Sequence, residues 1–99
     1  LAAQSVRVYA AAHRASVGHL RTANRDHEID MIVEGPDRRV VAIEVKLAAT
    51  VDDRDCRHLN WLQREIGDRL VNRIILTTGP HAFRRKDGVV VIPLALLGP

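Results

Sequence analysis

Residues 40–47 read Val-Val-Ala-Ile-Glu-Val-Lys-Leu, a stretch that combines the composition of a buried β-strand with two charged side chains. Side chains of a strand point alternately to its two faces, so Glu44 and Lys46 share one face. Burying a carboxylate or an ammonium costs free energy unless the group is paired or binds a metal. The stretch therefore predicts a strand that carries a functional site.

A second strand is predicted just upstream, at residues 27–34, which read His-Glu-Ile-Asp-Met-Ile-Val-Glu. The intervening Gly-Pro-Asp-Arg is typical of a tight turn, so this stretch and a strand over 39–47 are expected to form a hairpin. Alternation places Ile29, Met31 and Val33 on one face, and Glu28, Asp30, Ile32 and Glu34 on the other. If the hairpin pairs in register, Asp30 and Glu44 present their carboxylates to a common point.

The segment before the hairpin predicts a helix followed by a short strand. Residues 1–16 are rich in alanine and carry apolar side chains at helical spacing, so we expect a helix that starts upstream. Gly18 is expected to break this helix, and residues 19–22 to form a short strand.

The segment after the hairpin predicts a helix over residues 54–67, capped at its start by Asp52 or Asp53 and ended by Gly67. Its buried stripe is expected to consist of Cys56, Leu59, Leu62 and Ile66.

Two more strands complete the prediction, at residues 71–78 and 89–92. A basic loop over 84–88 precedes the last strand, and Pro93 is expected to start a tail. The resulting order, α-β-β-β-α-β-β, predicts an α/β fold in which a mixed sheet is flanked by helices.

The 99 residues suffice for one domain with a single modest core. A formal charge of +3 suits a polyanionic partner without requiring one. The single cysteine, Cys56, precludes an internal disulfide, and no apolar run has membrane-spanning length, so we expect a cytoplasmic protein with no membrane association. The chain opens at Leu1 within a helical pattern, as expected for a fragment of a longer polypeptide.

The carboxylates of Asp30 and Glu44 suggest a metal site, because two carboxylates and several waters are a common ligand set for Mg²⁺. A bound metal polarises a phosphoryl oxygen and lowers the pKa of its water, which supplies a nucleophile for hydrolysis. Lys46 is placed to orient that water or to stabilise developing negative charge. The pattern of two acids and an amine therefore favours metal-dependent hydrolysis.

This pattern, Asp30 followed after a hairpin by Glu44-Val45-Lys46, resembles the PD-(D/E)XK nuclease superfamily, whose restriction-endonuclease-like core has the order α-β-β-β-α-β. A closer likeness covers nearly the whole chain. The segments around Arg21-Thr22, 27–30, 42–46, 55–62, Thr77-Thr78-Gly79 and Pro93-Leu94 are similar to the C-terminal domain of unknown function found in bacterial and archaeal AAA+-type ATPases.

The resemblance implies a single nuclease-like domain over residues 1–99, the C-terminal part of a longer ATPase, that hydrolyses DNA with Mg²⁺ or Mn²⁺. It implies that Asp30 and Glu44 hold the metal and that Lys46 is the catalytic base or electrostatic stabiliser. The superfamily also places an acid on the first core helix, where this chain offers Gln4 and no Asp or Glu before Asp26. The implied partners are DNA and the N-terminal ATPase domain of the parent chain.

Weaker candidates for nucleic-acid contact are Arg84, Arg85, Lys86 and Gln63. For each, a solvated surface position is the alternative. Cys56 and Trp61 are expected to be core residues, and the five histidines show no metal-ligand spacing along the sequence.

Three alternatives remain open at the level of sequence. Glu44 and Lys46 can be an ordinary ion pair on an edge strand. The scaffold can serve as a catalytically inactive module that binds nucleic acid or docks a protein. The apolar ends, Leu1-Ala2-Ala3 and residues 94–97, can form an oligomerisation surface.

Overall fold

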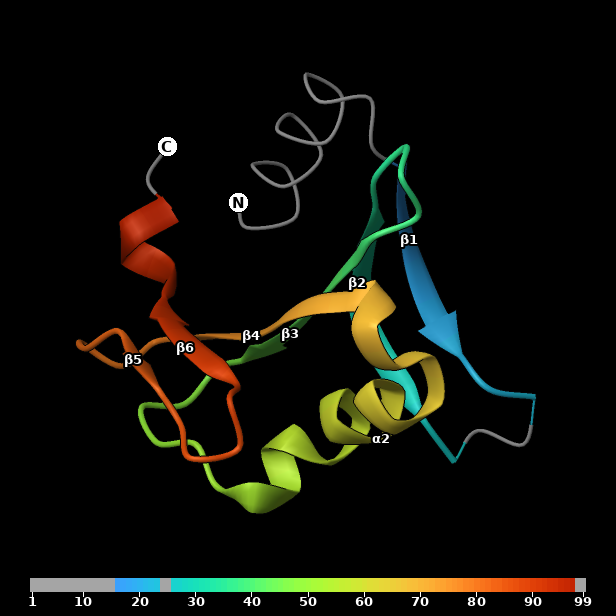
Figure 1. Ribbon diagram of the computed structural model, residues 1–99. Helices are drawn as coiled ribbons and strands as arrows, with labels where there is room; N and C mark the ends of the chain where they lie inside the picture. The colour runs from blue at the N-terminus through green and yellow to red at the C-terminus, as the bar shows by residue number, and fades with distance from the viewer. Residues whose placement is uncertain (1–15, 24–25, 98–99) are drawn as a thin grey trace.

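The computed structural model of the protein describes residues 16–23 and 26–97, which form a six-stranded mixed sheet with one α-helix packed on one face (Figure 1). The helix predicted over 1–16 lies outside these residues, except Ser16, which opens a strand. The α/β class and the mixed sheet are confirmed.

The strands follow the order β1-β2-β3-β4-β6-β5 across the sheet. Their bounds are Ser16–Arg21 for β1, Glu28–Glu34 for β2, Val40–Lys46 for β3, Leu70–Thr77 for β4, Phe83–Arg84 for β5 and Val90–Pro93 for β6. Neighbouring strands run antiparallel from β1 to β3, parallel from β3 through β4 to β6, and antiparallel between β6 and β5. The short strand β5 was not predicted.

The predicted strands form, with shifted ends. The predictions for Gly18 and Pro93 were wrong. Gly18 does not break a helix but lies within β1. Pro93 does not start the tail but is the last residue of β6, in register with Thr77. A proline is tolerated there because the first or last residue of a strand need not donate to the ladder.

The predicted hairpin forms between β2 and β3. Its turn is closed by Gly35, whose N–H donates to the carbonyl of Arg39 over 2.9 Å, and by Arg38, which adopts a left-handed φ of 68°. The strands pair from Glu34↔Val40 to Met31↔Ile43.

The helix α2 spans Arg57–Ile66 and follows a 3-10 turn over Asp53–Cys56. Asp52 caps this turn, since its side chain accepts from the N–H groups of Arg54 and Asp55 while the Asp55 side chain accepts from the Asp52 N–H. The helix ends at Gly67, as predicted. Two more 3-10 turns, Gly67–Arg69 and Leu94–Leu97, complete the described elements.

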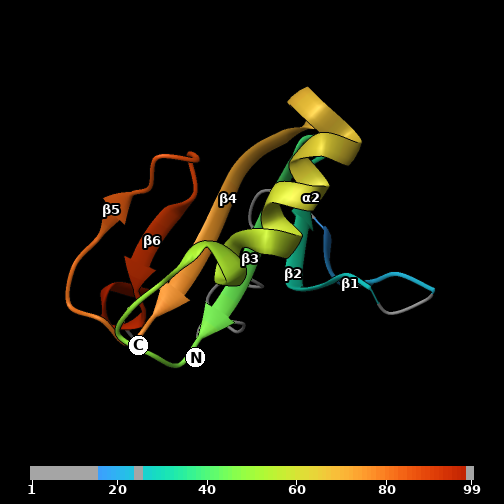
Figure 2. The same cartoon turned by 90° about the horizontal axis from the view of Figure 1, so that it is seen from below.

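The helix lies across β2, β3 and β4, and one core fills the space between it and the sheet (Figure 1, Figure 2). This core consists of Ile29, Val40, Ala42, Cys56, Leu59, Leu62, Leu70, Ile75 and Val89, with Ile66 partly buried against it. A second core on the opposite face centres on Met31, Ile43 and Leu76. The sheet is therefore apolar on both faces at its centre, as expected where parallel strands are present.

A β-bulge in β2 changes the face on which one predicted residue lies. Leu20 and Gly18 of β1 pair with Ile29 and Ile32, so two steps along β1 match three along β2. Ile29 therefore packs on the α2 side whereas Met31 packs on the opposite side. The prediction that these two side chains share a face was wrong, because an extra residue in one strand interrupts the alternation.

Among the described residues, no helix is long and apolar enough to cross a membrane.

Candidate functional site

Asp30 and Glu44 lie opposite each other where β2 and β3 stop pairing. The ladder ends at Met31↔Ile43, so Asp30 and Glu44 are the next residues along the two strands. The N–H of Asp30 donates to Oε1 of Glu44 over 3.0 Å, and the N–H of Val45 donates to Oδ2 of Asp30 over 2.8 Å. Each carboxylate thus reaches across to the backbone of the other strand, which brings the two predicted site residues together.

The two side chains reach this point for different local reasons. Glu44 continues the alternation of Val40 and Ala42, both of which are buried under α2, so its side chain points to the helix side of the sheet. Asp30 lies in the bulge of β2, and bulges re-aim side chains in this way next to binding sites. Glu44 is half-buried and Asp30 is exposed.

The electrostatics of the pair are dominated by Glu44. Burial, reinforced by the charge of Asp30, raises the pKa of Glu44 from 4.5 to about 7, although the hydrogen bond from the Asp30 N–H acts in the opposite direction. Glu28 adds a smaller repulsion. Two carboxylates that disfavour each other's charge in this way favour a nearby cation.

Lys46 lies on the same strand face as Glu44, and its amine is held by the carboxylate of Asp55. Both side chains are largely buried, with 30% of Lys46 and 22% of Asp55 exposed. The same carboxylate accepts from the N–H of Asp52 over 2.7 Å. The amine of Lys46 is therefore anchored at the capped start of the segment that leads into α2, not paired with Glu44 on an edge strand.

Sequence reasoning missed the role of Asp55. The available signal was the acid three residues after Asp52, which is the spacing of a capping box. That spacing identifies the cap but not the lysine that the fold brings to it.

The candidates for nucleic-acid contact lie elsewhere. Arg85 is 14% exposed, forms ion pairs with Asp53 and Asp87 and donates to the carbonyl of Val51 over 3.3 Å. Its guanidinium thereby ties the loop before β6 to the turn before α2. Arg84 is exposed and donates to the carbonyl of Gly88 over 2.9 Å.

Lys86 is exposed, and its loop joins the strands β5 and β6, which the central β4 separates from β3. Gln63 donates through its amide to the carbonyl of Gly67 over 3.1 Å and so closes the last turn of α2. None of these four side chains shares a hydrogen bond with Asp30 or Glu44 within the described residues.

In residues 16–23 and 26–97, no three metal-ligating side chains gather at one point. The described site thus offers the two carboxylates of Asp30 and Glu44. The predicted first helix, to which the resemblance assigns a further acid, and Gln4 lie outside the described residues.

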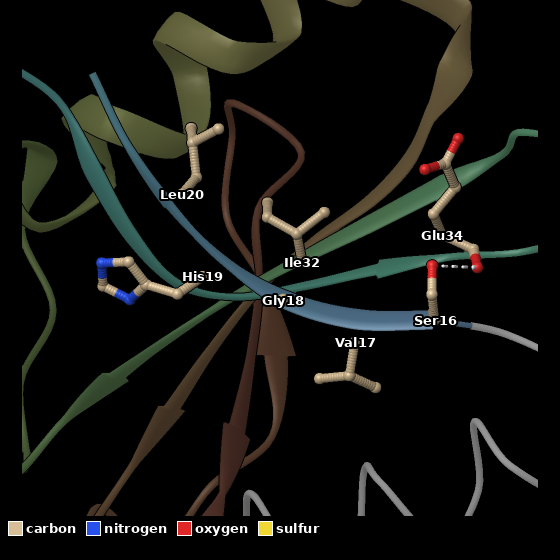
Figure 3. A pocket seen from close by; sticks show the side chains of 7 residues that line it. All are labelled: Ser16, Val17, Gly18, His19, Leu20, Ile32 and Glu34. Atoms are coloured by element: carbon tan, nitrogen blue, oxygen red, sulfur yellow. Dashed lines mark hydrogen bonds between the residues drawn. The ribbon is translucent and has the colours of Figure 1, made fainter. Parts of the chain in front are cut away.

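A shallow hollow on the surface lies over β1 and does not include the carboxylate pair (Figure 3). It is lined by Ser16, Val17, Gly18, His19, Leu20, Ile32 and Glu34. The hydroxyl of Ser16 donates to the backbone carbonyl of Glu34 across it, over 3.5 Å. Its ionisable side chains are paired with residues outside the lining, His19 with Glu28 and Glu34 with Arg69, so we assign the site by the chemistry of Asp30 and Glu44 instead.

A family model described as "Domain of unknown function (DUF4143)" matches residues 1–97. No curated protein and no solved structure matches the chain.

Proposed function

We propose that this chain, which belongs to the DUF4143 family of domains of unknown function, is a Mg²⁺-dependent phosphodiesterase of the PD-(D/E)XK type that acts on DNA. We further propose that it is the C-terminal partner of a AAA+-type ATPase domain. The observation that carries the proposal is the pair of cross-strand hydrogen bonds that joins Asp30 and Glu44.

The carboxylate pair fits a hard divalent cation. Among the described residues, Asp30 accepts its cross-strand hydrogen bond through Oδ2 and Glu44 through Oε1, which leaves Oδ1 and Oε2 as ligands. Mg²⁺ binds through one or two carboxylates and keeps several waters. The raised pKa of Glu44 supports the same assignment, because a bound cation would offset both the burial of the Glu44 charge and its repulsion by Asp30.

The protein groups around the pair suit phosphodiester hydrolysis. A bound Mg²⁺ polarises a phosphoryl oxygen and lowers the pKa of its water. Lys46 supplies a positive charge on the same strand face as Glu44, where it stabilises negative charge that develops on the phosphate. Asp55 limits the freedom of that ammonium, so that less ordering is needed when the substrate binds.

Two exposed arginines, Arg54 and Arg57, lie beside the anchored lysine among the acids Asp52, Asp53 and Asp55, and Arg54 is paired with Asp52 over 3.4 Å. Arginine contacts give affinity for a phosphate backbone without regard to sequence. Together with the formal charge of +3 of the chain, they favour a nucleic acid as the source of the phosphodiester.

A second candidate function is a module that binds nucleic acid or docks a protein without cleaving DNA. The observation that favours it is the absence of a third ligating side chain among the described residues. In this reading the Asp30–Glu44 pair stabilises the end of the hairpin and holds no metal.

Calorimetric titration with Mn²⁺ separates the two candidates. The first predicts one site in the wild type, lost in Asp30→Asn and Glu44→Gln and retained in the matched surface variants Asp68→Asn and Glu65→Gln. Hydrolysis of duplex, branched and single-stranded DNA with Mg²⁺ or Mn²⁺ then tests the chemistry, in this chain and in the full-length protein that carries it. Metal uptake without hydrolysis of any substrate would favour the non-catalytic module.

A further inference from the structure

Two histidine rings meet beside the start of β2, apart from the carboxylate pair. His27 directly precedes β2, and His58 is the second residue of α2. Their Nδ1 atoms lie 3.2 Å apart, and the rings cross at 86° with their centroids separated by 5.4 Å. Both residues are half-buried. The contact is thus formed by tertiary packing, which explains why it has no signature in sequence spacing.

Hydrogen-bond donors approach both nitrogens of His58. The N–H of Glu28 lies 3.4 Å from Nδ1, and the guanidinium of Arg57 lies 3.3 Å from Nε2. Because a neutral imidazole accepts at one nitrogen only, one of these two contacts is given up in either tautomer. Burial, with the positive charge of Arg57, lowers the pKa of His58, so its imidazole is neutral and keeps a lone pair at neutral pH.

The separation of the two nitrogens matches the bite of a tetrahedral metal site. Zinc binds histidine nitrogen at about 2.0 to 2.1 Å, so two ligands at a tetrahedral angle lie about 3.3 to 3.4 Å apart. The observed 3.2 Å between Nδ1 of His27 and Nδ1 of His58 is close to this value. A metal bound to both nitrogens would lie to one side of the line that joins them, so each ring would turn to direct its lone pair at the ion.

The orientation of one ring is fixed by an aromatic neighbour. Trp61 stacks on His27 with a centroid distance of 4.1 Å and an interplanar angle of 9°. Because Trp61 lies one helical turn after His58, α2 positions His58 and also the indole ring that stacks on His27. Such a site loses little side-chain entropy when it binds an ion.

We propose that His27 and His58 form a binding site for a transition metal ion of the zinc class, distinct from the carboxylate pair. Nitrogen ligands select zinc, copper and nickel ions, whereas the oxygen ligands of Asp30 and Glu44 suit magnesium and manganese. The two remaining coordination positions are open to water or to a bound ligand. A proton carried by either Nδ1 atom leaves to solvent or moves to Nε2 of the same ring when the metal binds.

Some of the charged side chains near the two histidines oppose a bound cation, and others favour one. The guanidinium of Arg57 lies 3.3 Å from Nε2 of His58 and opposes a cation. The carboxylate of Glu28 favours one, although it is shared with Arg21 at 3.2 Å and His19 at 3.4 Å. A site with two protein ligands and these neighbours is expected to be open and exchangeable, as in a catalytic or regulatory metal site.

Trp61 is the only tryptophan of the chain and provides a direct reporter. Addition of Cu²⁺ is expected to quench its fluorescence, because the stacked His27 would hold the ion nearby, and a large excess of Zn²⁺ is expected to reverse the quenching, since nitrogen ligands prefer Cu²⁺. His27→Gln and His58→Gln should each weaken the effect at least tenfold. His81→Gln, at an exposed position, and the Asp30→Asn/Glu44→Gln double variant should leave it unchanged.

A second measurement uses the wild type alone, in case a histidine variant fails to fold. Nitrogen-15 spectra of the imidazoles should show Zn²⁺ shifting the Nδ1 signals of His27 and His58 before those of the other histidines. The proposal is overturned if Zn²⁺ leaves these two signals in place, or if a folded His58→Gln variant binds Cu²⁺ as the wild type does.

Discussion

Asp30 gives its backbone N–H to the carboxylate of Glu44, while its own carboxylate accepts the N–H of Val45, so side chains replace the ladder at the open end of the hairpin. This arrangement satisfies both backbone donors but holds two carboxylates next to each other. Burial of Glu44 and, to a smaller extent, the charge of Asp30 disfavour the ionised form, and both raise the pKa of Glu44. Sites that bind cations commonly accept such a penalty in the free protein.

The first prediction concerns stability against pH. The pKa of Glu44 rises from 4.5 to about 7 on folding, so the folded state binds the proton more tightly than the unfolded state. Stability should therefore fall as the pH rises from about 4.5 to 7, and the loss should be complete above that range. Glu44→Gln keeps an oxygen acceptor for the N–H of Asp30 and removes the titrating group. Urea denaturation should show the variant to be more stable than the wild type at pH 8, with a flatter pH profile.

The matched control for this substitution is Glu65→Gln, at an exposed position on α2. It should leave the pH profile of the wild type intact. A Glu44→Gln variant that is less stable than the wild type at pH 8 would contradict the assigned penalty.

The second prediction is that Mn²⁺ stabilises the protein more at pH 8 than at pH 5.5. At the lower pH Glu44 is protonated and must lose its proton before it can bind a cation. An ion at a hundred times its dissociation constant should raise the free energy of unfolding by about 2.7 kcal/mol. Thermal melts with and without Mn²⁺ at the two pH values give the comparison, and an equal shift at both would count against Glu44 as a ligand.

The third prediction concerns Asp55, a positioning residue that acts through Lys46. Asp55→Asn keeps an oxygen for the N–H of Asp52 but removes the ion pair with the lysine. We expect a stability loss of about 1 kcal/mol, since the exposed parts of the two side chains let solvent screen the ion pair. If the domain cleaves DNA, kcat should fall while the affinity for Mn²⁺ is kept. A loss of metal affinity with kcat unchanged would show that Asp55 does not act through Lys46.

The fourth prediction separates two neighbours in the basic loop. Arg85→Ala should destabilise the fold by about 1 to 3 kcal/mol, because it leaves Asp87 and the carbonyl of Val51 without the guanidinium. Lys86→Ala should leave the unfolding free energy within about 0.5 kcal/mol of the wild type. If the loop contacts DNA, Lys86→Ala should also lower the slope of log affinity against log salt by about 1. Equal destabilisation by the two substitutions would contradict the structural role given to Arg85.

Much of the fold could be predicted because its signals are local. The turn at 35–38, the alternation over 39–47 and the cap at Asp52 each depend on residues a few positions apart, and all three are confirmed. Parallel pairing of β3 with β4 follows from the helix that joins them.

The features that the sequence did not predict depend on contacts between residues far apart in the chain. The bulge that moves Ile29 to the α2 side is set by the pairing of β2 with β1, so no pattern within 27–34 reveals it. Asp55 has no visible role beyond the cap until β3 brings Lys46 to it. Likewise, only the packing of the loop before β6 against the turn before α2 shows that the guanidinium of Arg85 is engaged.

Calorimetric titration of the wild type with Mn²⁺ at pH 8 decides whether Asp30 and Glu44 hold a divalent cation together. We expect a single site that disappears in Asp30→Asn and in Glu44→Gln, while Asp68→Asn and Glu65→Gln bind as the wild type does. Absence of binding in the folded wild type, or binding that persists in both site variants, would contradict it.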